Sequence, residues 1–127
     1  MKITEKRLTG NLGEKKVAKF LKKNKFKISA RNYSCKYGEI DIIAENKDLI
    51  LFVEVKTRDI SQIVAPQFAV DYRKQRRLMM TAHKYLIDFP SFKQPRFDIA
   101  EVIINGKEFT INYIDNAFQQ ESDYAVF

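Results

Sequence analysis

The chain has 127 residues, of which 45% are hydrophobic and 31% are charged, a balance typical of folded globular domains and not of disordered chains. A chain of this length can bury one core, so we expect a single domain over residues 1–120 and a flexible tail over residues 121–127. Lys and Arg number 23 against 16 Asp and Glu, and the formal net charge of +7 favours a polyanionic partner such as nucleic acid. A basic protein without such a partner would have the same charge, so motifs must decide between the two.

One cysteine and the absence of a long apolar run limit where the protein can work. Cys35 is the only cysteine, so no disulfide can form within the chain, which fits a reducing compartment. The longest unbroken apolar run, Leu49–Val53, is far shorter than a membrane span. We therefore expect a cytoplasmic protein with no membrane contact.

The first predicted element is an amphipathic helix from Leu8 to Asn24. Val17, Ala18 and Leu21 recur at helical spacing and form its apolar face. Glu14 falls at the centre of this face, whereas the lysines lie on the opposite one. An unpaired buried carboxylate is costly, so we expect a positive side chain or a metal ion to meet it. The alternative is a partly exposed Glu14 near the positive end of the helix dipole.

Three strands are predicted next, over Lys27–Tyr33, Gly38–Glu45 and Leu49–Lys56. In the third strand, Glu54 and Lys56 alternate with two valines, so the two charges project from one face.

The preceding strand brings a second acid toward Glu54. Glu39 and Asp41 alternate with Ile40 and Ile42, which we expect to share a face with the valines, leaving Asp41 on the face of Glu54. Two carboxylates about 4 to 5 Å apart repel by a few kcal/mol at an effective dielectric of about 20, so a cation is expected between them. Oxygen ligands favour Mg²⁺ or Mn²⁺ over Zn²⁺. Spacing alone leaves open an exposed face with an ordinary Glu–Lys salt pair.

Lys56 lies beside this pair of acids. Its ammonium could orient the attacking water and offset the charge that develops on a phosphate. The three residues together therefore predict phosphodiester hydrolysis.

A second helix is predicted from Pro66 to Asp88, with an apolar stripe of Leu78, Ala82, Tyr85 and Phe89. Lys74 and Gln75 continue this stripe and are expected to face the body of the protein. Lys74 could then reach the acids or a phosphate, although a lysine that extends along the surface to reach water is the alternative. The outward-facing basic residues are Arg73, Arg76, Arg77 and Lys84.

Two final strands are predicted over Arg96–Asn105 and Glu108–Ile114, joined by a hairpin turn at Asn105 and Gly106. The order α-β-β-β-α-β-β predicts an α/β or α+β fold with three layers, in which helices flank a central mixed sheet. Asp98 is expected to have a structural role.

Several sequence blocks resemble the YraN-like family, which belongs to the PD-(D/E)XK nuclease superfamily with archaeal Holliday-junction resolvases. The blocks are Gly10-Asn11-Leu12-Gly13-Glu14, Gly38-Glu39-Ile40-Asp41, Phe52-Val53-Glu54-Val55-Lys56-Thr57-Arg58, Lys74, Arg96-Phe97-Asp98 and Asn116-Ala117-Phe118. The resemblance spans nearly the whole chain and implies a restriction-endonuclease-like fold. It also implies that Asp41 and Glu54 are metal ligands, that Lys56 is the catalytic lysine and that Glu14 is an auxiliary acid. Ile40 departs from the proline in the superfamily's name.

The leading hypothesis is a Mg²⁺-dependent or Mn²⁺-dependent endonuclease that hydrolyses phosphodiester bonds of DNA with water as the nucleophile. The candidates for nucleic-acid contacts are Lys74, Arg58, Gln75 and Tyr37. Symmetric cutting of two strands would require a homodimer. Two alternatives remain open: a nuclease-like module that binds nucleic acid without cutting it, and a protein-interaction domain.

Overall fold

The computed structural model describes residues 5–62 and 71–119. Its elements follow the predicted order, with one short 3-10 helix (η1) added after the third strand. They are α1 (Glu5–Lys23), β1 (Lys27–Cys35), β2 (Gly38–Glu45), β3 (Leu49–Asp59), η1 (Ile60–Gln62), α2 (Tyr72–Asp88), β4 (Gln94–Asn105) and β5 (Glu108–Phe118).

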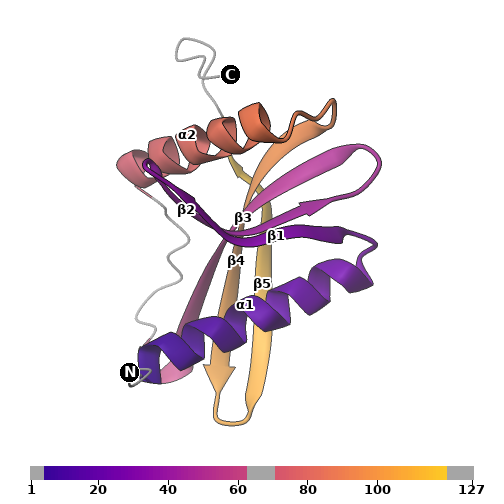
Figure 1. Ribbon diagram of the computed structural model, residues 1–127. Helices are drawn as coiled ribbons and strands as arrows, with labels where there is room; N and C mark the ends of the chain where they lie inside the picture. The colour runs from indigo at the N-terminus through magenta and orange to yellow at the C-terminus, as the bar shows by residue number, and fades with distance from the viewer. Residues whose placement is uncertain (1–4, 63–70, 120–127) are drawn as a thin grey trace.

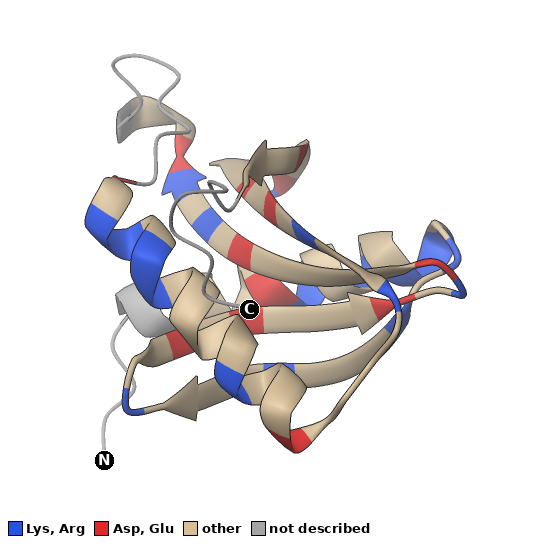
Figure 2. Cartoon of the chain, turned by 90° about the horizontal axis from the view of Figure 1, so that it is seen from above, with Lys and Arg blue, Asp and Glu red and all other residues tan. Residues whose placement is uncertain are grey.

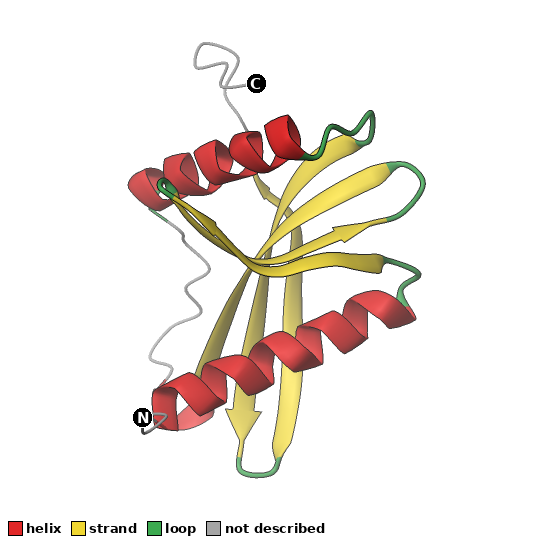
Figure 3. Cartoon of the chain, in the orientation of Figure 1, coloured by secondary structure: helices red, strands yellow, loops and turns green. Residues whose placement is uncertain are grey.

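The strands form one mixed sheet in the order β1-β2-β3-β4-β5. Neighbouring strands are antiparallel except β3 and β4, which run parallel from Leu49 opposite Gln94 to Asp59 opposite Ile104. A parallel pair needs a long crossover connection, and α2 lies within that connection. The two helices cover opposite faces of the sheet (Figures 1 and 3). The predicted mixed sheet with flanking helices is therefore confirmed.

The predicted apolar face of α1 packs on one side of the sheet. Val17, Ala18 and Leu21 are no more than 6% exposed. They form a cluster with Ile42, Ala44, Leu51, Val53, Ala100 and Val102. Val55 packs against the same cluster, so Val53 and Val55 share a face as predicted.

The other side of the sheet packs against α2 through Leu78, Ala82 and Tyr85, whose burial agrees with the predicted stripe. The sheet residues of this cluster are Ile40, Ile43, Ile50, Phe52, Phe97 and Ile99. Phe89 continues the stripe only in part: its ring lies 4.9 Å from that of Tyr85, but the residue is the C-cap of the helix and is 57% exposed.

The beginning of α2 also differs from the prediction. Asp71 has an extended backbone and caps the helix, and its side chain accepts a hydrogen bond of 2.9 Å from the backbone N–H of Lys74. The helix therefore starts at Tyr72 and cannot run unbroken from Pro66, which lies outside the described residues, as does the predicted tail, residues 121–127. Neither helix in the described ranges is long and apolar enough to cross a membrane.

Candidate active site

The candidate site lies where β2 and β3 separate. The two strands pair from Glu45 opposite Ile50 to Ile42 opposite Val53. Asp41, the residue that precedes Ile42 in the chain, lies just beyond this paired region. Its Oδ2 atom accepts a hydrogen bond of 2.8 Å from the backbone N–H of Val55. The Asp41 carboxylate therefore reaches across the separation and satisfies a backbone donor of β3.

The side chains of β2 change sides at Asp41. Ile40 packs in the α2 cluster, whereas Ile42 packs in the α1 cluster. The prediction that these two isoleucines share a face is therefore wrong. At Ile40 the strand is paired with β1 but no longer with β3, and Asn32, which lies between the β1 partners of Ile42 and Ile40, has a φ of 53°. The predicted approach of Asp41 to Glu54 was argued from regular alternation in β2, so its premise fails. In the structure the approach comes instead from the hydrogen bond between Asp41 and the N–H of Val55, the residue after Glu54, and Glu54 is the charged group that raises the pKa of Asp41 most.

Val53 and Val55 point toward α1, so Glu54, which lies between them in the strand, points to the α2 side of the sheet. It is 8% exposed, and its Oε1 atom lies 2.5 Å from Nζ of Lys74. Lys74 therefore faces the body of the protein, as its helical position predicted, and its ammonium neutralises one carboxylate of the site.

Burial and mutual repulsion set the protonation of this pair of acids. Burial, followed by the charge of Glu54, raises the pKa of Asp41 from 3.8 to about 7, although the hydrogen bond from Val55 opposes the shift. With a pKa of about 7, the Asp41 carboxyl group is partly protonated near neutral pH, and a bound cation would favour its charged form.

Lys56 projects from the same face of β3 as Glu54. Burial lowers its pKa, and the charges of Lys74 and Arg58 lower it further, whereas Glu54 raises it. The site therefore combines two close carboxylates with an ammonium that releases its proton more readily than an exposed lysine would.

Glu14 approaches the site from α1. Its Oε1 atom lies 3.7 Å from Nη2 of Arg31 on β1, which is the positive side chain that its helical position called for. Burial raises the pKa of Glu14, Arg31 and a hydrogen bond from Asn32 oppose this, and Glu39 and Glu54 add to it. Oε1 has no hydrogen-bond partner among the described residues. The structure thus brings Glu14 into the electrostatic environment of the other acids.

A glycine lets α1 come close to β3. A Cβ atom added at Gly13 would lie 1.9 Å from Oγ1 of Thr57, which follows Lys56 directly. With any larger residue here, either the Thr57 side chain or the two elements themselves would have to move. Gly13 therefore allows the neighbouring Glu14 to approach the sheet at this point.

The sequence analysis missed Glu101. This residue of β4 is 2% exposed and stands opposite Lys56 in the parallel register, and its Oε2 atom lies 3.6 Å from Nε of Arg58. Within the described part of the chain, Oε2 has no hydrogen-bond partner. Glu101 is the one charged residue in the otherwise apolar run of residues 99–104, which was a signal, but its position beside Lys56 follows only from the parallel pairing.

The remaining sequence candidates lie on three different elements. Arg58 continues β3 beyond Lys56 and forms the ion pair with Glu101. Gln75 is partly buried in the first turns of α2. Tyr37 lies in the turn between β1 and β2, with the ammonium of Lys36 above its ring at 5.1 Å. The fold gives the positions of these three residues, and their proposed contacts with nucleic acid stay a prediction.

The two central acids have the chemistry of a magnesium site. No three Asp, Glu, His or Cys side chains within residues 5–62 and 71–119 are grouped closely enough to enclose a metal by themselves. Mg²⁺ commonly takes one or two carboxylates and obtains its other ligands from water and substrate phosphate. The oxygen donors of Asp41, which is partly buried, and of Glu54, which is buried, fit such an ion.

Asp98 has a different environment and the structural contacts expected of it. It is 0% exposed and receives hydrogen bonds from Nε of Arg96 (2.9 Å), the hydroxyl of Tyr113 (2.5 Å) and the backbone N–H of Asn116 (2.8 Å). These contacts span the register shift between β4 and β5. Two of the sequence blocks, Arg96-Phe97-Asp98 and Asn116-Ala117-Phe118, therefore have a structural explanation: their polar contacts join β4 to β5.

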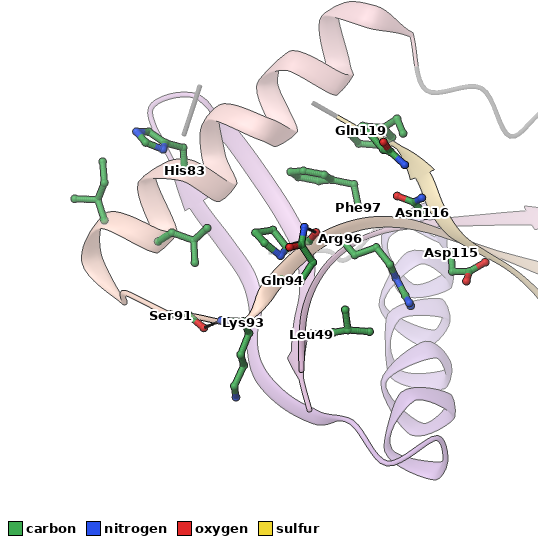
Figure 4. Close-up of a pocket in the computed structure, with 14 residues that line it drawn as sticks. Leu49, His83, Ser91, Lys93, Gln94, Arg96, Phe97, Asp115, Asn116 and Gln119 are labelled. Atoms are coloured by element: carbon green, nitrogen blue, oxygen red, sulfur yellow. Dashed lines mark hydrogen bonds between the residues drawn. The ribbon is translucent and has the colours of Figure 1, made fainter. Parts of the chain in front are cut away.

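A pocket of about 890 Å³ lies at the other end of β3 from Lys56 (Figure 4). Its lining includes Leu49, the first residue of β3, together with Phe97 and Phe118, and it contains none of the predicted site residues. Arg96 also borders it, but that guanidinium is paired with Asp98. The pocket is therefore separate from the acids at the strand separation.

Fold and site together define a small α/β protein with a mixed five-stranded sheet and a carboxylate and lysine cluster at a strand separation. The chain belongs to the family described as "Uncharacterised protein family UPF0102", whose profile matches residues 13–102. This agrees with the YraN-like resemblance of the sequence.

Curated relatives match over most of their length. UPF0102 protein TTE1452 of Caldanaerobacter subterraneus subsp. tengcongensis is 45% identical over 123 residues, covering 93% of this chain and 100% of the relative. UPF0102 protein CA_C1763 of Clostridium acetobutylicum is 42% identical over 113 residues, covering 87% and 93%. A UPF0102 protein of Myxococcus xanthus is 36% identical over 115 residues, covering 90% and 91%.

Proposed function

We propose that this protein is a metal-dependent nuclease of the restriction-endonuclease-like PD-(D/E)XK type, which hydrolyses phosphodiester bonds of DNA with Mg²⁺ or Mn²⁺. The observation that carries the proposal is the hydrogen bond of 2.8 Å from the N–H of Val55 to the Asp41 carboxylate, because it places Asp41 beside Glu54 and Lys56 where β2 and β3 separate. A buried carboxylate and a partly buried one in close proximity repel each other, and a cation between them relieves the repulsion. A lysine beside them adds the group that phosphoryl chemistry uses to offset negative charge.

The functional group of each residue suggests its role in the reaction. Asp41 and Glu54 would hold the ion, which supplies Lewis acidity and lowers the pKa of a bound water. Lys56, whose pKa is lowered by burial, would orient the water and neutralise charge on the phosphate. Glu14 would assist from α1 through its negative charge and its contact with Arg31.

The basic half of α2 offers a surface for the phosphate backbone. Four of its first six residues are basic: Arg73, Lys74, Arg76 and Arg77. Figure 2 shows that these charges gather at the N-terminal part of the helix, and Lys74 within this group contacts Glu54. The Cβ atom of Arg77 lies 3.7 Å from the Cβ position of Gly38, so this half of α2 runs beside the start of β2. A DNA strand bound there would pass close to the acids.

The test is a cleavage assay with linear, single-stranded and four-way-junction DNA in Mg²⁺ or Mn²⁺. We expect the wild type to cut at least one substrate, and Asp41→Asn and Lys56→Met each to lose about 100-fold or more in rate while still binding DNA. Asp48→Asn is the matched control, because this exposed carboxylate lies in the turn at the far end of β2 and should leave the rate unchanged. Equal rates for Asp41→Asn and the wild type would contradict the proposal.

A second candidate is a nuclease-like protein that binds DNA without cutting it. The ion pair between Lys74 and Glu54 favours it, because a lysine there neutralises a carboxylate that a metal would need. Binding at low salt that falls steeply as salt rises, with no cleavage in any metal, would support this candidate. No binding at low salt would leave only the protein-interaction domain.

A further inference from the structure

The ion pair between α2 and β3 involves one of the two proposed metal ligands. Nζ of Lys74 lies 2.5 Å from Oε1 of Glu54. The Glu54 side chain is 10% exposed, whereas that of Lys74 is 47% exposed, so the carboxylate is fixed within the protein and the ammonium reaches it from the surface. Lys74 is the third residue of α2, and its flexible stem can direct the charge elsewhere without disturbing the helix.

We propose that Lys74 is an exchangeable counter-ion: it competes with the divalent metal for Glu54, and when the metal binds it moves to a phosphate of the bound nucleic acid. This inference rests on the proposed function. It predicts that the Lys74 side chain weakens the binding of the metal and strengthens the binding of phosphate.

Electrostatics favours such an exchange. An ammonium and a divalent cation repel each other strongly when both contact one buried carboxylate, so the binding of one opposes the binding of the other. Lys56 and Arg58 place further positive charge close to Lys74. Their closeness is reflected in the pKa of Lys56, which the charges of Lys74 and Arg58 both lower. A phosphate entering beside the metal would offer the displaced ammonium a new partner.

The chain contains a matched control on the same helix. Lys84 also forms a single ion pair, with Oδ1 of Asp88 at 3.0 Å, and its side chain is 42% exposed. Lys84→Met and Lys74→Met therefore remove the same charge from the same helix at similar exposure. Only the second change removes a competitor for Glu54.

The first measurement is Mn²⁺ binding by calorimetry on the full chain without DNA. We expect Lys74→Met to lower the dissociation constant of the metal by about fivefold, as loss of a competing ion pair of ordinary strength would do, while Lys84→Met leaves it within twofold of the wild type. Asp41→Asn identifies the site by weakening binding in either background. An unchanged or weaker affinity in Lys74→Met would overturn the inference.

The second measurement is the salt dependence of binding to a short DNA duplex, in Ca²⁺ and in EDTA. Ca²⁺ also takes oxygen ligands and here stands in for the catalytic ion. In Ca²⁺ the slope of log affinity against log salt should fall by about one for Lys74→Met, as loss of a single phosphate contact predicts, and in EDTA it should equal the wild-type slope. Equal slopes in Ca²⁺ would show that Lys74 does not move to a phosphate and would overturn that part.

The outcomes separate this inference from the proposed function. If the wild type binds metal through Asp41 and cuts DNA but Lys74→Met changes neither affinity nor slope, the inference fails and the nuclease proposal stands. If Lys74→Met alone binds Mn²⁺, the competition is supported even when the wild type does not cut. If no variant binds metal, both fail.

Discussion

Two groups of buried charge in this sheet are stabilised in opposite ways. Asp98 accepts hydrogen bonds from Arg96, Tyr113 and Asn116, so its charge is well compensated. Asp41 faces the like charge of Glu54, and burial with this repulsion raises its pKa to about 7. The first group stabilises the fold, whereas the second is held at a cost to stability, which is typical of sites that bind ligands or perform chemistry. Opposite responses to mutation should reveal the difference.

The largest effect is expected from Asp98→Ala. The change leaves the Arg96 guanidinium, the Tyr113 hydroxyl and a backbone N–H without their buried acceptor, so the free energy of unfolding should fall by about 3 to 5 kcal/mol. Urea denaturation measures it. A loss below about 1 kcal/mol would contradict the structural role that we assign to Asp98.

Gly13→Ala tests the contact between α1 and β3. Alanine normally stabilises a helix interior relative to glycine by about 1 kcal/mol. Here the new Cβ would lie 1.9 Å from Oγ1 of Thr57, so we expect a net loss of about 1 to 3 kcal/mol in thermal or urea unfolding. Gly10→Ala is the control, because a Cβ there meets nothing within 4 Å, and it should stabilise the protein. The same sign for both variants would show that the close approach is wrong.

Asp41→Asn should stabilise the protein at high pH, in contrast to Asp98→Ala. The Asp41 pKa is about 7 in the folded chain and 3.8 as an ordinary carboxyl group, so between these values the folded state binds more protons and stability falls as pH rises. Asparagine has no carboxyl group to titrate, and its side-chain oxygen can still accept the hydrogen bond from the Val55 N–H. We expect a gain on the order of 2 kcal/mol at pH 8 in EDTA and none at pH 3, from unfolding curves. Equal differences at both pH values would refute the raised pKa.

Tyr113→Phe should have the smallest effect. It removes one of the donors to Asp98 and keeps the ring that packs against Phe20, so we expect a loss of about 1 kcal/mol in unfolding free energy. Together with Asp98→Ala, it measures how much of the first group's stability comes from a single hydrogen bond.

The sequence predicted those parts of the fold that depend on local periodicity. The helical spacing of Val17, Ala18 and Leu21 predicted the buried face of α1, and alternation predicted that Val53 and Val55 share a face, because each pattern repeats within one regular element. The hairpin between β4 and β5 followed from Asn105 and Gly106, and Gly106 has a φ of 62° that suits glycine.

Irregular and non-local features could not be predicted in the same way. Ile40 and Ile42 pack in different clusters at the point where β2 is no longer paired with β3, and no local pattern marks where that pairing stops. Glu101 comes beside Lys56 only through the parallel register of β3 and β4, which joins residues far apart in the chain. The approach of Lys74 to Glu54 was predicted in direction by the helical wheel, but the contact itself depends on where α2 crosses the sheet.

The most direct test of the account is a crystal structure of the full chain grown with Mn²⁺, with anomalous scattering data collected to locate the ion. We predict an anomalous peak within ligand distance of both the Asp41 and Glu54 carboxylates, which is lost in Asp41→Asn. Well-ordered carboxylates with no peak between them at millimolar Mn²⁺ would contradict the claim that the two acids share a metal ion.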